Sequence, residues 1–169
     1  MTYLTRKLRI IFSSNIGLIH TFCAVAAIAT GALVIVSRKG TRKHRLIGFS
    51  YVATMLLTNL TALFTQSLYQ FGPFHWMALA SLLTVCAGVS APLFFRHKPN
   101  WLMLHYEVML WSYVGLIAAM FAEIAVRIPA IGQVVGGSQV FWGLVISASA
   151  LTFVIGGVLI GRHKKRFFG

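Results

Sequence analysis

The chain of 169 residues is 58% hydrophobic and only 10% charged, whereas soluble domains carry about 25% charged residues. This composition excludes a soluble globular domain and predicts an integral membrane protein. The net charge of +13 does not indicate a nucleic-acid partner, because the Lys and Arg residues lie almost entirely between or beyond the apolar segments. The expected partners of these cations are anionic lipid headgroups.

Five apolar segments are long enough to cross a bilayer as helices, which takes about 20 residues each. They lie at about 16–37, 46–69, 74–96, 102–127 and 139–161. The loops between them are short, so consecutive helices should be antiparallel neighbours. The first segment follows a basic stretch, as in a signal peptide, but its length fits a retained anchor better. The predicted fold class is an all-α integral membrane protein, a single domain over residues 1–169 in which five transmembrane helices include a four-helix core.

The distribution of Lys and Arg predicts how this bundle is oriented. One side has eleven of them, in residues 38–45, 96–98 and 162–166, and the opposite side has four. Short cytoplasmic loops carry the excess of positive charge. The N-terminus is therefore expected outside and the C-terminus inside, with anionic lipids at the inner face.

Each of the first four predicted helices contributes one histidine, and an ionisable residue inside a span is by default a functional hypothesis. His20 and His75 lie near the outer ends of helices one and three, and His44 and His105 near the inner ends of helices two and four. The two layers are separated by roughly 20 to 25 Å. Two stacked pairs of histidines suit two b-type haems, because each iron takes two axial imidazoles from facing helices.

The acidic residues suggest an alternative metal site. The chain has only two acids, and one of them, Glu123, lies 18 residues after His105. This spacing is about five helical turns, so both side chains leave the same face of helix four. Glu123 should then lie in the outer layer with His20 and His75, which together form a ligand set typical of zinc or non-haem iron. A divalent-metal binding or transport protein is therefore an alternative function.

Ordinary structural roles also account for these residues. A histidine near a helix end is often an interfacial anchor that keeps its polar tip wet, and His44, between Lys43 and Arg45, fits that role. Glu123 can form an ion pair with Arg127, its neighbour one turn later. A cofactor-free accessory subunit of a larger membrane complex is therefore a third alternative.

Two family resemblances meet at the same residues. The chain resembles the bacterial membrane family catalogued as domain of unknown function 2306 in His20, Lys39-Gly40, His44-Arg45, Gly48, Tyr51 and the segment SYVGLIAAMFAE at 112–123. This resemblance implies a bacterial inner (plasma) membrane but no activity. The layout of one histidine per helix is similar to the four-helix core of the cytochrome b-561 family. That similarity implies haem ligation by His20 with His75 and by His44 with His105, and a glutamate, here Glu123, near the outer end of helix four.

The leading expectation is a membrane b-type cytochrome-like electron-transfer protein with one or two haems b between helices one and three and helices two and four. Its electron donor is expected to be a quinol, an ascorbate-like reductant or a partner oxidoreductase. Bis-histidine ligation leaves no open position on the iron, which favours electron transfer over oxygen chemistry.

Overall fold

The structure is a computed structural model that describes residues 15–64, 72–127 and 138–168. All regular elements in these ranges are helices: α2 (Asn15–Val36), α3 (Arg42–Phe64), α4 (Pro73–Phe94), α5 (Trp101–Arg127) and α7 (Ser138–Phe168). Each of the five contains a stretch long and apolar enough to cross a membrane. The predicted fold class, an all-helical membrane protein with five spans, is confirmed.

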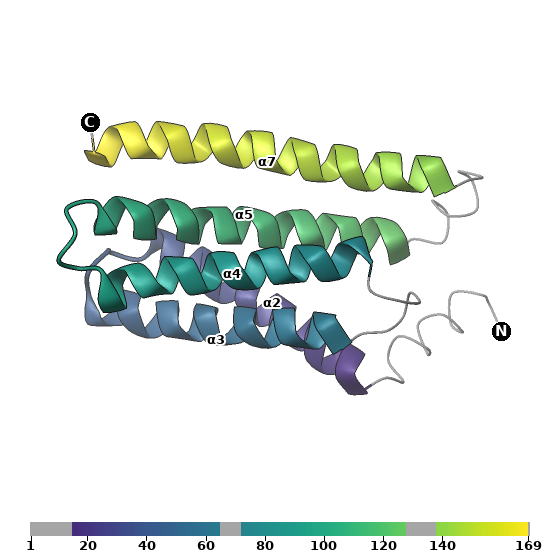
Figure 1. Ribbon diagram of the computed structural model, residues 1–169, viewed down its shortest axis with the longest axis horizontal. Helices are drawn as coiled ribbons and strands as arrows, with labels where there is room; N and C mark the ends of the chain where they lie inside the picture. The colour runs from purple at the N-terminus through teal and green to yellow at the C-terminus, as the bar shows by residue number, and fades with distance from the viewer. Residues whose placement is uncertain (1–14, 65–71, 128–137, 169) are drawn as a thin grey trace.

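Helices α2 to α5 form a four-helix bundle in which each helix runs antiparallel to the one before it (Figure 1). Helix α2 packs along α3, α3 packs against α4, and α4 packs along α5, whereas α2 and α5 meet at only a few points. The pairs α2–α4 and α3–α5 therefore lie on the diagonals of the bundle. Helix α7 packs along α5 on the outside of this core (Figure 1).

The two ends of the bundle differ in charge. Residues 37–41 connect α2 to α3 and residues 95–100 connect α4 to α5 at the same end where α7 finishes (Figure 1). We call this the basic end, because it carries the Lys and Arg residues of those two connections and of the end of α7. We call the opposite end, where α2, α4 and α7 begin, the far end.

Helix α3 begins at Arg42, four residues before the start of the predicted span at 46. The backbone N–H of His44 donates to Thr41 Oγ1 at 3.1 Å, the contact by which a threonine caps a helix N-terminus. Gly40 precedes this cap with a φ of 77°, a left-handed conformation that glycine adopts without strain. His44 therefore lies in the first turn of α3. The last part of the predicted span, residues 65–69, lies outside the described residues.

The tightest packing is found midway along the bundle. Tyr51 and Met55 of α3 are each only 1% exposed. Across the α3–α5 diagonal, the Tyr51 hydroxyl is hydrogen-bonded to Ser112 Oγ at 2.9 Å, and the Tyr51 and Tyr113 ring centroids lie 6.3 Å apart. Gly31 of α2 makes this approach possible, because a Cβ there would lie 2.9 Å from the Tyr51 ring and closer still to that of Tyr113. These contacts fix the register of α3 against α5.

Large apolar side chains cover the outside of the bundle. They include the exposed residues Phe22, Val36, Leu83, Phe94, Leu151 and Val154. Soluble monomers rarely expose an apolar patch of that extent. These side chains therefore form the lipid-facing surface of a membrane bundle. The surroundings of the five helices are therefore a lipid bilayer.

Candidate functional site

His44 and His105 face each other at the basic end. Helices α3 and α5 run in the same direction, and His44 and His105 lie seven residues before Tyr51 and Ser112 respectively. Seven residues are about two helical turns and about 10 Å along the axis. Both histidines therefore leave the same helix faces as the hydrogen-bonded Tyr51–Ser112 pair, two turns nearer the basic end. Consistent with this placement, the two imidazoles interact electrostatically.

The hydrogen bonds of these two rings show which nitrogen carries the proton. His105 Nδ1 lies 2.8 Å from the Gly88 carbonyl of α4, and since a carbonyl only accepts, His105 donates its Nδ1–H. His44 Nδ1 lies 3.1 Å from Ser37 Oγ, whose own hydrogen is donated to the Val34 carbonyl at 2.9 Å. The single hydroxyl hydrogen is thus in use, so His44 also donates its Nδ1–H. In both neutral rings the lone pair lies on Nε2.

The contacts at Nδ1 of His44 and His105 are compatible with metal binding through Nε2. Metal-binding histidines almost always donate the second ring N–H to a carbonyl, a carboxylate or water, which orients the ring and makes the coordinating nitrogen more basic. The hydrogen bonds from His44 to Ser37 and from His105 to Gly88 are both made through Nδ1. Two imidazoles on facing helices, each with a coordinating nitrogen available, match the donor set of a bis-histidine haem.

Basic groups lie around this pair of histidines. Lys39 interacts electrostatically with His44 and donates to the Val34 and Ile35 carbonyls, at 2.8 and 2.5 Å, at the end of α2. Partial burial lowers the pKa of Lys39, because it penalises the charged ammonium. The exposed side chains of Arg42 and Arg45 stand in the first turn of α3. A ligand with carboxylates at its edge, as haem has in its propionates, would find counter-charges here.

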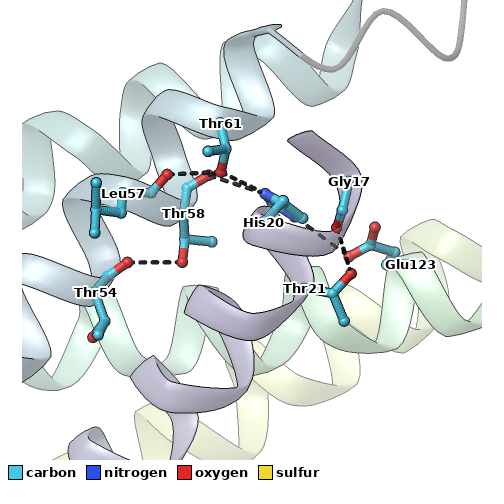
Figure 2. A network of polar contacts seen from close by, with 8 residues as sticks. All are labelled: Gly17, His20, Thr21, Thr54, Leu57, Thr58, Thr61 and Glu123. Atoms are coloured by element: carbon cyan, nitrogen blue, oxygen red, sulfur yellow. Dashed lines mark hydrogen bonds and ion pairs between the residues drawn. The ribbon is translucent and has the colours of Figure 1, made fainter. Parts of the chain in front are cut away.

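At the far end, His20 joins three helices, as Figure 2 shows. Its Nδ1 lies 3.1 Å from the Thr58 carbonyl and 3.0 Å from Thr61 Oγ1, both on α3. Its Nε2 lies 3.8 Å from Glu123 Oε2 on α5. Because the Thr58 carbonyl only accepts, Nδ1 carries a proton, and the neutral ring presents its lone pair to the carboxyl group. His20 thus has an acceptor on each side.

His75 has a different role at this end. The Gly72 N–H donates to Nδ1 of His75 at 3.2 Å, which caps the N-terminus of α4. A neutral ring that accepts at Nδ1 carries its proton on Nε2, the reverse of the arrangement in His44 and His105. In this position His75 has no lone pair at Nε2 for an iron, so its donor set does not fit haem ligation.

The structure does not assemble the predicted three-ligand metal set. In residues 15–64, 72–127 and 138–168, no group of three or more His, Cys, Asp or Glu side chains is placed to hold a metal ion. His20 and Glu123 lie close together, but His75 does not join them in such a group. The side chain of Arg127, the expected ion-pair partner of Glu123, lies outside the described part of the chain.

The other acidic residue stabilises the contact between two helices. Glu107 Oε1 of α5 lies 2.5 Å from Lys164 Nζ of α7. Both side chains are partly exposed, so the pair contributes modestly to stability. The two acids of the chain thus have separate roles: Glu107 holds α7 at the basic end, and Glu123 faces His20 at the far end.

Several residues that shape these sites were not among the predicted site residues. Ser37 and Gly88 orient His44 and His105, yet a hydroxyl in a loop and a backbone carbonyl give no recognisable signal in a sequence. Asn59 is 5% exposed, and its Nδ2 has no hydrogen-bond partner in the described part of the chain. Its position inside an apolar span was the available signal, because a polar residue there usually forms interhelical hydrogen bonds.

Five apolar helices with ionisable side chains among them define a multi-pass membrane protein. The chain matches the family described as predicted membrane protein (DUF2306) over residues 17–160, and it belongs to this family. The predicted resemblance to that family is confirmed. No curated protein and no solved structure matches the chain, so the similarity to the cytochrome b-561 family stays a prediction.

Proposed function

We propose that the protein is a membrane b-type cytochrome-like electron-transfer protein with one haem b between His44 of α3 and His105 of α5. One observation carries this proposal: both rings donate Nδ1–H to fixed partners and keep Nε2 for a metal. The proposal is narrower than the expectation of one or two haems, because at the far end His20 is hydrogen-bonded to α3 and lies near Glu123, and His75 caps α4.

The chain's own residues account for the chemistry of such a site. Haem, when bound, supplies one-electron transfer. His44 and His105 would hold the haem through Nε2, and ligation by two histidines would favour electron transfer over oxygen chemistry. The Gly88 carbonyl and Ser37 hydroxyl hold the two rings in orientation and increase the basicity of Nε2. The neighbouring cations neutralise the carboxylates of the bound group.

The charge distribution supports the membrane orientation that we propose for this protein. Eleven of the fifteen Lys and Arg residues lie at the basic end, which supports an inside position for that end in a bacterial inner membrane. Anionic lipids at the inner face are the counter-charge that these residues would meet. The electron acceptor is a redox partner that docks at the inner face beside His44 and His105.

The absorption spectrum of the purified protein tests this proposal. Protein produced with ample haem should show a sharp α-band after reduction with dithionite, because bis-histidine ligation gives a low-spin b-type spectrum. A flat visible spectrum from well-folded protein would reject the cytochrome function. Metal analysis of the same sample would then decide between the metal-binding and the cofactor-free alternatives.

A further inference from the structure

The far end has an ionisable pair that the proposed haem does not use, and this pair lies where α2 and α5 meet, a junction that we call the seam. Helices α2 and α5 meet at only a few points. Helix α7 lies on another side, packed along α5 and joined to α4 by the stacked rings of Phe74 and Trp142, 5.8 Å apart. Glu123 faces the seam with its side chain 41% exposed, and His20, 13% exposed, lies behind it.

Glu123 and His20 can together accept a proton from a lipid-soluble molecule. A carboxylate at membrane depth is costly and marks a functional position by default. His20 donates Nδ1–H to the Thr58 carbonyl, which fixes its Nε2 lone pair toward Glu123 at 3.8 Å. A proton delivered to the exposed carboxylate therefore has a second acceptor behind it, within the same pair of side chains.

A buried donor lies at the same depth. Asn59 is five residues before the end of α3, and His20 is five residues after the start of α2. At this level α4 and α5 contribute Ala78 and Ala122, which are 6% and 1% exposed. Among the residues that the structure describes, Asn59 Nδ2 has no hydrogen-bond partner, although buried polar groups are almost always paired. The layer thus contains an unused donor beside small side chains and a proton-accepting pair.

We infer that this far-end layer binds a quinol, a lipophilic dihydroxybenzene that reaches the seam through the bilayer. One hydroxyl donates to Glu123, and the second oxygen accepts from Asn59 Nδ2. This assignment deepens the proposed function and rests on it for the electron acceptor. The binding of the headgroup by Asn59 and Glu123 does not depend on haem.

The reaction balances with the groups available. Oxidation of one quinol to a quinone releases two protons and two electrons. Each proton passes to the Glu123–His20 pair and then to water at the far end. A haem held by His44 and His105 would take up the two electrons one at a time, and a partner at the inner face would remove the first before the second is taken up. His44 and Thr58 are fourteen residues apart on α3, so the electrons cross about 21 Å along the bundle axis, past Tyr51 and Tyr113.

The first experiment measures binding without using redox activity. Decylubiquinone is titrated into purified protein while tryptophan fluorescence is recorded. We expect saturable quenching whose midpoint rises at least tenfold in Asn59→Leu. The matched control is Ser112→Ala, which changes another buried polar residue of the bundle and should leave the midpoint unchanged. Quenching that rises linearly without saturation, or a midpoint equal in wild type and Asn59→Leu, would overturn the assignment.

The second experiment measures haem reduction by decylubiquinol in proteoliposomes. Glu123→Gln keeps the size of the side chain but removes the proton acceptor, so the rate should fall at least tenfold while the haem-to-protein ratio stays constant. Glu107→Gln changes the other acid of α5 and should react at the wild-type rate. Equal rates for the two variants would overturn the role of Glu123. If the protein contains no haem, the proposed function fails, and the fluorescence titration still decides whether the quinone site exists.

Discussion

The two ends of the bundle use the same residue type in opposite ways. At the basic end, His44 and His105 both donate through Nδ1 and keep Nε2 available. At the far end, His75 accepts through Nδ1 at a helix cap, and His20 lies between a carbonyl and a carboxyl group. In the proposed function, the partner of Nδ1 decides which histidine can bind a metal and which holds a proton or a backbone N–H.

Replacement of His44 or His105 should have the largest effect on the difference between the two ends. His44→Ala or His105→Ala removes one of two iron ligands, so the haem-to-protein ratio of the purified variant should fall close to zero. His75→Ala should keep the wild-type ratio, because His75 caps α4 instead of offering Nε2. His97→Ala, a histidine in the exposed connection at 95–100, controls for nonspecific loss. Haem loss in His75→Ala with retention in His44→Ala would reverse the roles of the two ends.

Removal of the hydroxyl behind His44 should have a smaller effect on the same site. Ser37→Ala deletes the acceptor of the His44 Nδ1–H, and loss of such a partner typically lowers metal affinity by about 10- to 100-fold. The rate of haem transfer to an excess of an acceptor protein measures this change. Ser37→Thr retains the hydroxyl and should behave as wild type. Identical transfer rates for Ser37→Ala and wild type would contradict the assigned orientation of His44.

Replacement of Gly31 tests the packing that fixes the register of α3 against α5. Gly31→Leu forces a side chain against the rings of Tyr51 and Tyr113, and overpacking of this kind costs about 1 to 3 kcal/mol. The free energy of unfolding in detergent should fall by that amount. Gly161→Leu is the control, because a Cβ at Gly161 meets nothing within 4 Å. Equal stability of the two variants would show that Gly31 is not a close-packing position.

The smallest expected effect comes from the hydrogen bond across the α3–α5 diagonal. Tyr51→Phe keeps the ring but removes the bond to Ser112, and a typical hydrogen bond contributes about 1 kcal/mol. Ser112 Oγ still donates to the Met109 carbonyl at 2.7 Å, so no donor is left unpaired. We expect this small loss of stability in detergent unfolding with an unchanged haem-to-protein ratio. A loss above about 3 kcal/mol would mean that the bond organises the whole core.

The length of the apolar segments predicted the five spans, because each segment must be apolar over a bilayer thickness whatever its tertiary contacts. The helical spacing between His105 and Glu123 predicted that Glu123 lies at the level of His20, which agrees with the 3.8 Å between their side chains. Ring orientation was beyond sequence reasoning. The orientation of His105 depends on a backbone carbonyl, that of Gly88, and a group that every residue has gives no signal in a sequence. The orientation of His44 depends on Ser37, which lies close to His44 only because the chain turns at Gly40 and Thr41 before α3 begins.

The haem-to-protein ratio of the purified wild-type protein tests the central claim most directly. Pyridine haemochrome analysis of haem, combined with amino-acid analysis of the protein, gives this ratio without assumptions about the spectrum. The difference between the two ends predicts a value near one, with haem at the basic end alone. A value near two would show that His20 and His75 also bind a haem, and a value near zero would show that neither end does.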